Sequence, residues 1–189
     1  MAEPKKKKVT ASTAPKTKKE AAPVGNATGL RIGAVVLWVV AVALEVVAYL
    51  MLIGKINLTF MATLTQVIIA LVLDLVCVII GSALWKKANH IKPASEKNKV
   101  LFWLWNNMGL IVCTIAFLPF VILALTNKDA DKKTKTIATV VAAVALLIGG
   151  AASIDYNPVS EEQQTAAIEA INTDVYWSPF GKVYHTHED

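Results

Sequence analysis

Residues 67–84 read VIIALVLDLVCVIIGSAL, and Asp74 is the one Asp, Glu, Lys or Arg among them. A helix of about 20 apolar residues crosses the hydrocarbon core of a bilayer. Further long apolar runs precede and follow this stretch, with lysines crowded into the gaps between them. They predict four membrane spans, at about 32–53, 59–85, 100–126 and 136–154. We therefore expect an all-α membrane protein whose residues 31–155 form a four-transmembrane-helix bundle.

Charge is distributed unevenly along the chain. Of the 189 residues, 55% are hydrophobic and 17% are charged, against about 25% charged in a typical soluble domain. This composition excludes a disordered protein, a coiled coil and most nucleic-acid-binding domains. The net charge is +5, but residues 1–31 hold seven lysines and Arg31 against Glu3 and Glu20, which gives +6. Residues 1–30 therefore predict a disordered basic tail whose partner is the anionic inner leaflet of the bilayer, not nucleic acid.

The lysine and arginine counts in the short loops predict an orientation. With the N-terminus inside, the tail contributes eight basic residues, residues 86–99 five and Lys182 one, so 14 lie on the cytoplasmic side. The outside receives five, from Lys55 and the four lysines of 128–135. Tryptophan is enriched at membrane interfaces, and three would lie near the cytoplasmic one: Trp85, Trp103 and Trp105. We expect a multi-pass protein of the cell membrane with both termini in the cytoplasm.

Two carboxyl side chains fall inside the predicted spans. At 1.5 Å per residue, Glu45 lies roughly 21 Å from Arg31, and Asp74 lies roughly 18 Å from Lys86. The two groups should therefore have nearly the same depth on adjacent antiparallel helices. One hypothesis is a proton- or cation-handling site, because two carboxyls close together in a low dielectric cannot both ionise easily. The alternative is that each is protonated and holds helices together by hydrogen bonds across the bundle.

Other intramembrane residues suggest packing faces. Gln66 shares a face of the second span with Asp74, while Asn106 and Asn107 lie two turns into the third span, where at least one can reach the bundle interior or the headgroups. Pro119 should kink that span. The fourth span carries a stripe of small residues, which predicts close packing inside the bundle or, as the alternative, a homo-oligomer: Ala138, Ala142, Ala145 and Gly149.

The C-terminal segment 156–189 is acidic and patterned. Together with Asp155 it holds seven acidic residues against Lys182. Ser160 and Gln163 have the spacing of a capping box, which predicts a short helix over 161–172. The stretches DVYWS and KVYHT on either side of 179–181 predict a small β-hairpin. A two-stranded hairpin is marginally stable alone in water, so the segment reads as an incomplete module.

Four stretches resemble a group of uncharacterised multi-pass membrane proteins of gut bacteria: WKKANHIKPASEKNK at 85–99, LWNNMG at 104–109, the stretch from DKKTKTIATVV to IDYNPVS at 131–160, and VYWSPFGKVYHTHED at 175–189. The resemblance covers most of the chain from Arg31 onward. It implies a tail that continues into a cysteine and a later C-x-x-C, suggestive of a metal-binding or redox module. Here the sequence stops at Asp189, so His185 and His187 are at most remnants of a metal site. The group carries no established activity.

Two functional readings follow. The first is a non-enzymatic integral membrane protein that presents a cytoplasmic C-terminal interaction or sensing module. The alternative is a small proton or cation transporter or channel that uses Glu45 and Asp74. No nucleophile–base pair, phosphate-binding glycine loop or H-E-x-x-H motif argues for an enzyme, and no cofactor is expected.

Overall fold

The computed structural model describes residues 25–58, 60–128 and 130–171, and every regular element within them is an α-helix. The described residues from 25 to 161 form one compact unit that contains five helices, and the sixth helix is described by itself. The helices are α1 (Ala27–Leu52), α2 (Thr63–Ile91), α3 (Lys99–Asn106), α4 (Met108–Thr126), α5 (Lys132–Ser153) and α6 (Glu161–Ile171). Four of them, α1, α2, α4 and α5, are long and apolar enough to cross a membrane. This confirms the all-α class with four spans and indicates an integral membrane protein.

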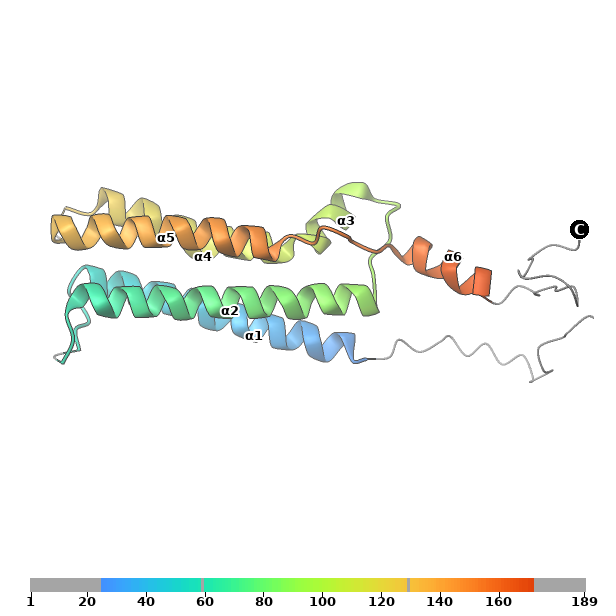
Figure 1. Ribbon diagram of the computed structural model, residues 1–189, viewed down its shortest axis with the longest axis horizontal. Coiled ribbons are helices and arrows are strands. Elements are labelled where there is room, and N and C mark those ends of the chain that lie inside the picture. The colour runs from blue at the N-terminus through green and yellow to red at the C-terminus, as the bar shows by residue number, and fades with distance from the viewer. Residues whose placement is uncertain (1–24, 59, 129, 172–189) are drawn as a thin grey trace, which may run out of the picture. The chain divides into compact units, whose positions relative to one another are not determined.

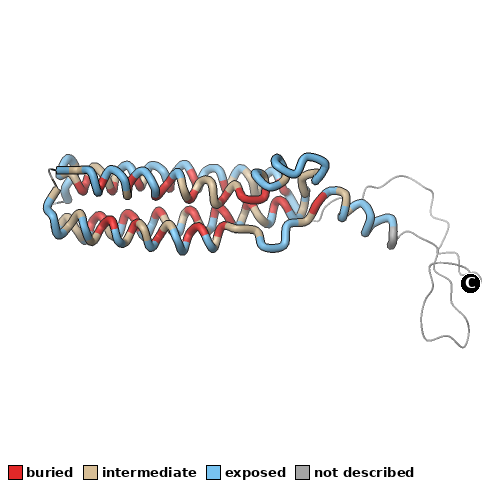
Figure 2. Tube along the Cα trace, turned by 90° about the horizontal axis from the view of Figure 1, so that it is seen from above, coloured by how far each residue is buried: buried red, intermediate tan, exposed pale blue. Residues whose placement is uncertain are grey.

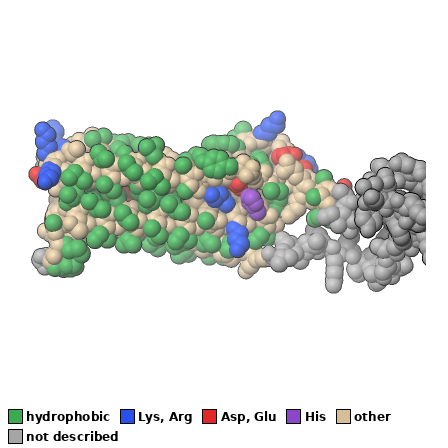
Figure 3. All heavy atoms as spheres, viewed as in Figure 1, with side chains coloured by type: hydrophobic (Ala, Val, Ile, Leu, Met, Phe, Trp, Pro, Cys, Tyr) green, Lys and Arg blue, Asp and Glu red, His purple; other side chains and the backbone are tan. Residues whose placement is uncertain are grey.

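The four long helices run antiparallel in two layers, α1 with α2 and α4 with α5 (Figure 1). Residues 53–62 and 127–131 join them at one end, which we call the loop end. At the opposite end, the terminal end, α1 begins and α2 and α5 finish. Buried residues line the sides of the helices that face each other (Figure 2). Hydrophobic side chains also cover the outer face of the bundle, with basic side chains towards its two ends (Figure 3), as expected of a surface that meets lipid.

Buried residues recur on α1 and α2 in alternating steps of four and three. On α1 they include Ala34, Trp38, Ala41, Glu45, Ala48 and Leu52. On α2 they include Val67, Leu71, Asp74, Val78, Gly81, Trp85 and Ala88. An average step of 3.5 residues is typical of helices that pack at a shallow angle in bundles. Glu45 and Asp74 each occupy one of these interior positions, so the fold directs both carboxyl groups away from lipid.

The predicted third span is divided in the structure. The sequence predicts one helix over 100–126, but α3 ends at Asn106 and α4 begins at Met108. Asn107, between them, has φ −105° and ψ 19°. The Asn106 and Asn107 side-chain amides donate to the carbonyls of Phe102 and Trp103, each at 2.9 Å. Asparagine side chains compete in this way for backbone hydrogen bonds, which explains a break that a continuous apolar pattern hides.

Other boundaries also differ from the prediction. The predicted tail reaches residue 30, but α1 begins at Ala27, because the Asn26 side chain accepts a hydrogen bond from the Gly29 N–H at 2.9 Å and caps the helix. Helix α2 begins at Thr63 instead of 59 and continues past Trp85 to Ile91, shortly before Pro93. The short C-terminal helix is present as α6. The predicted β-hairpin, His185, His187 and most of the basic tail lie outside the described residues.

Candidate functional site

Four polar residues occupy the buried face of α2, spaced eight, eight and seven residues apart: Gln66, Asp74, Ser82 and Asn89. None is more than 3% exposed. Because a helical turn takes 3.6 residues, they recur about every two turns, or roughly every 11–12 Å along the helix. They place polar groups at intervals from the loop end of the bundle to its terminal end.

Asp74 is the most isolated of the four. Its side chain is 0% exposed, and neither carboxyl oxygen has a hydrogen-bond partner among the described residues. The carboxyl lies close enough to Glu45 of α1 for the two groups to interact electrostatically, and it interacts in the same way with the thiols of Cys77 and Cys113. The structure thus brings together the two carboxyls singled out in the sequence.

Glu45 differs from Asp74 because it has a partner. Its Oε1 accepts a hydrogen bond from the backbone N–H of Phe120 at 3.0 Å. Phe120 follows Pro119, which lies inside α4. A proline ring removes one helical hydrogen bond and clashes with the carbonyl four residues earlier, which loosens the backbone bonds at that turn. The Glu45 carboxyl supplies an acceptor to a backbone donor at this interruption.

Gln66 has a local role. Its Oε1 accepts from the Leu58 N–H at 3.0 Å, and its Nε2 lies 2.9 Å from Asn57 Oδ1, 2.9 Å from the Leu58 carbonyl and 2.6 Å from the Met61 carbonyl. The cap residue Ala62 provides no side-chain hydrogen bond to the first turn of α2. Gln66 therefore holds the loop before α2 in place.

Small residues of α5 face the interior of the bundle. Ala138, Ala142, Ala145 and Gly149 are all buried. A Cβ atom added at Gly149 would come within 2.9 Å of Cys113 Sγ and 3.0 Å of Leu75 Cδ1. The stripe predicted for close packing therefore packs inside this chain, and a homo-oligomer through α5 stays a prediction. Both cysteines are free thiols.

Sequence reasoning missed a hydroxyl pair between Asp74 and the terminal end. Ser153 of α5 donates to Ser82 Oγ of α2 at 2.8 Å, and both are buried. Gly109 of α4 allows this approach, because a Cβ atom there would lie 2.7 Å from Ser82 Cβ. The regular spacing of polar residues on α2 is the signal that could have identified Ser82 and Asn89.

An aromatic and amide cluster closes the terminal end. The guanidinium of Arg31 lies 5.7 Å from the ring centroid of Trp85 and 5.2 Å from that of Trp105. It donates to Asn89 Oδ1 at 3.3 Å and to the Lys92 carbonyl at 2.8 Å. Cation–π contacts and hydrogen bonds together stabilise the ends of α1 and α2 against each other.

The same cluster positions Asn106. The Asn89 amide donates to Asn106 Oδ1 at 3.3 Å and to the Trp105 carbonyl at 3.2 Å. Trp85 Nε1 also donates to the Trp105 carbonyl at 2.8 Å. Asn106 is thus brought into the bundle interior. The Asn107 amide, by contrast, bonds to the Trp103 carbonyl of α3.

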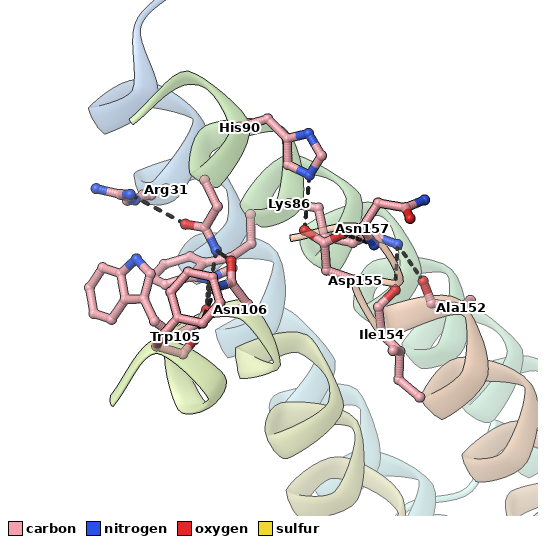
Figure 4. Close-up of polar contacts among 12 residues, drawn as sticks. Arg31, Lys86, His90, Trp105, Asn106, Ala152, Ile154, Asp155 and Asn157 are labelled. Atoms are coloured by element: carbon pink, nitrogen blue, oxygen red, sulfur yellow. Dashed lines mark hydrogen bonds and ion pairs between the residues drawn. The ribbon is translucent and has the colours of Figure 1, made fainter. Parts of the chain in front are cut away.

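The segment after α5 is fastened to α2. Lys86 Nζ donates to the carbonyls of Ala152 at 2.7 Å and Ile154 at 3.4 Å, where the end of α5 leaves carbonyls without helical partners. His90 Nε2 lies 2.9 Å from Asp155 Oδ2 (Figure 4). Beyond the end of α2, the Ala94 carbonyl accepts from the Glu161 N–H at 3.1 Å. We call the contacts of Lys86 and His90 the α2 clamp.

Within the part of the chain that the structure describes, no group of three or more His, Cys, Asp or Glu side chains is placed to hold a metal ion. Comparison with protein-family models, curated proteins and solved structures finds no match to this chain.

Proposed function

We propose that this integral membrane protein handles protons, and that Glu45 and Asp74 bind and release them inside the bundle. The observation that carries the proposal is Asp74: it is fully buried, without a hydrogen bond from any described residue, and within electrostatic range of a second carboxyl, that of Glu45. An uncompensated carboxylate at membrane depth is costly. A carboxyl at such a position suits a function in which it binds a proton and becomes neutral, and releases the proton and becomes charged.

The alternative role, in which carboxyls only hold helices together, fits one of the two residues. Glu45 does bond across the bundle, to Phe120. Asp74 makes no such bond among the described residues, so it does not join two of the described helices by a hydrogen bond. Buried polar groups without partners destabilise a fold, and retaining one is understandable where a function requires it.

The donor set favours a proton over a metal cation. A proton needs a single oxygen lone pair, whereas Ca²⁺ binds about six to eight oxygens and Mg²⁺ about six. The neighbours of Asp74 include the thiols of Cys77 and Cys113, and the buried core around the two carboxyls is apolar. Two carboxyls with such neighbours supply too few oxygen ligands for these ions.

A route for protons follows the buried face of α2. From Asp74, the Ser82–Ser153 hydroxyl pair lies towards the terminal end, and the Asn89–Asn106 amide pair lies beyond it. The spacing of about 11–12 Å exceeds hydrogen-bond reach. Transfer along this face would therefore use water molecules between the polar groups.

Proton flux in liposomes tests the proposal. The full chain is reconstituted with a pH-sensitive dye inside, and a potassium gradient with valinomycin supplies the driving voltage. We expect flux above that of empty liposomes, with loss of most of it in Asp74→Asn and in Glu45→Gln. Glu96→Gln is the matched control, because it removes an exposed carboxyl from the loop before α3.

The outcomes distinguish the two roles. Flux no greater than in empty liposomes, or equal flux in the wild type and both buried variants, contradicts proton handling. Fluorescence of the cluster formed by Trp38, Trp85 and Trp105 reports whether each variant has folded. A variant that loses flux while keeping the wild-type emission supports the proposal.

A second proposed function is the one favoured by the sequence, presentation of the C-terminal segment as a cytoplasmic interaction or sensing module without enzymatic activity. The α2 clamp supports it, because Lys86 and His90 fasten the chain just before that segment to a membrane helix. A pull-down with the full chain and with a variant lacking residues 172–189 tests it. Equal recovery of every protein and of zinc from both would contradict this function.

A further inference from the structure

Helix α3 exposes an apolar face that no part of the described chain covers. Its sequence is KVLFWLWN, and four of its large apolar residues are exposed: Val100 by 70%, Leu101 by 56%, Trp103 by 55% and Leu104 by 38%. At 100° per residue these four lie on one half of the helix, and the buried Asn106 lies on the other. A contiguous exposed apolar face of this kind marks a contact with a partner or a membrane.

Helix α3 is not needed to cross the bilayer. Helix α4 alone has 19 residues, or about 28 Å at 1.5 Å per residue, which matches a hydrocarbon core of about 30 Å. The division at Asn107 separates the spanning helix from α3, which leaves the axis of the bundle in Figure 1.

The contacts of α3 place it at the border between lipid and water. The Trp105 carbonyl accepts from Trp85 and Asn89 of α2, and Lys86 and Lys87 lie beside these residues in the sequence. This is where α2 changes from an apolar helix to a charged one. A helix held at that level meets the headgroups, not the centre of the bilayer.

The charges around α3 indicate the kind of lipid surface. Three exposed lysines, Lys92, Lys97 and Lys99, precede or begin the helix, against one acid, Glu96. Asn98 caps it by accepting from the Leu101 N–H at 3.1 Å. Interfacial helices combine Trp and Leu on the buried side with flanking lysines that attract anionic lipid. Helix α4, which follows, exposes apolar side chains of its own, including Ile115 and Leu118.

We propose that α3 is an interfacial helix, which inserts its Val100–Leu101–Trp103–Leu104 face into the boundary between headgroups and acyl chains at the terminal end of the bundle, with Lys97 and Lys99 among anionic headgroups. It anchors this end of the bundle at a set depth in one leaflet. The occupant of the face is therefore lipid, not a second copy of the chain.

Site-directed labelling in membranes tests this placement. In the full chain with Cys77→Ala and Cys113→Ala, a nitrobenzoxadiazole label is attached at Leu101→Cys or, as the matched control, at Lys99→Cys on the other half of the helix. The vesicles contain phosphatidylcholine with or without phosphatidylglycerol. We expect dithionite to reduce the label at position 101 about fivefold more slowly than that at 99, and nitroxide near the top of the acyl chain to quench it best. Phosphatidylglycerol should increase the protection.

Each other outcome overturns the proposal. Equal reduction rates at 101 and 99 would mean that water covers the apolar face. Strongest quenching by a nitroxide deep in the acyl chain would mean that α3 continues the span of α4. Protection without quenching from lipid, or cross-linking between two copies at position 101, would mean that protein covers the face. A label at Trp103→Cys repeats the measurement if the variant at 101 does not fold.

Discussion

The backbone N–H of Phe120 in α4 donates a hydrogen bond to Oε1 of Glu45 in α1, with 3.0 Å between the two atoms. The donor directly follows Pro119, and the acceptor is a buried carboxyl. The relationship joins the proline that interrupts one membrane helix to an ionisable residue of another. A change in the protonation of Glu45 would therefore act directly on a hydrogen bond of the α4 backbone.

Replacing Glu45 should show this dependence. Glu45→Ala removes the carboxyl acceptor of the buried Phe120 N–H, which should lower the free energy of unfolding by about 1–3 kcal/mol. Glu45→Gln retains a side-chain oxygen and should cost less. Unfolding in mixed micelles of detergent and SDS measures both. In a Pro119→Ala background the cost of Glu45→Ala should shrink, because the helix can then satisfy the N–H itself; an undiminished cost would show that Pro119 is not the cause.

Glycine at position 109 should be intolerant of a methyl group. A Cβ atom there would lie 2.7 Å from Ser82 Cβ and 3.2 Å from Ser153 Cβ, so Gly109→Ala should destabilise the protein by about 1–3 kcal/mol. At Gly150 the nearest atom would be Leu110 Cδ1 at 3.4 Å, an end of a flexible side chain. Gly150→Ala should therefore be nearly neutral. Thermal unfolding of both variants compares them, and equal losses would contradict the packing described.

Arginine at position 31 should not be replaceable by lysine. The guanidinium contacts two indole rings and two oxygen acceptors at once, an arrangement that a compact ammonium group cannot reproduce. We expect Arg31→Lys to lower stability by about 1 kcal/mol and to change the tryptophan emission. Lys55→Arg, in the loop at the other end of the bundle, is the control; wild-type emission and stability in Arg31→Lys would show that charge alone suffices.

The start of α5 should depend on pH. The Asp131 carboxylate accepts from the Thr134 backbone N–H at 2.9 Å and from its hydroxyl at 3.1 Å, and these hydrogen bonds lower the pKa of Asp131 below its ordinary 3.8. A lowered pKa means that the stabilisation is present above pH 3.8 and is lost as pH falls through the folded-state value. In Asp131→Ala the amide of Thr134 should therefore exchange its hydrogen faster than in the wild type at neutral pH. The difference should vanish in acid, and one that persists there would exclude the carboxylate as its source.

The four membrane helices could be predicted from the sequence because each needs only a long apolar run, and burial in lipid does not depend on partners. Asn107 shows the limit of that reasoning. The hydropathy of 100–126 is continuous, and the break arises from the side-chain amides of Asn106 and Asn107, each of which bonds to the backbone carbonyl four residues earlier. Such local competition leaves no trace in an apolar average.

The candidate site was predictable in part for a similar reason. Helical rise places Glu45 and Asp74 at one depth whatever their neighbours are. The sequence did not reveal that Glu45 bonds to Phe120 while Asp74 bonds to nothing described, because that difference depends on which side of α1 faces Pro119. The cation–π contacts of Arg31 depend likewise on three helices meeting, whereas the sequence alone marks Arg31 only as a basic residue beside the first span.

Helix α2 packs against α1, α4 and α5, and the same helix carries Asp74 in its middle and the α2 clamp at its terminal end. A pull on the chain after α5 is therefore applied, through Lys86 and His90, to the helix that holds the buried carboxyl. One helix thus connects the segment that follows α5 to the buried carboxyl of Asp74.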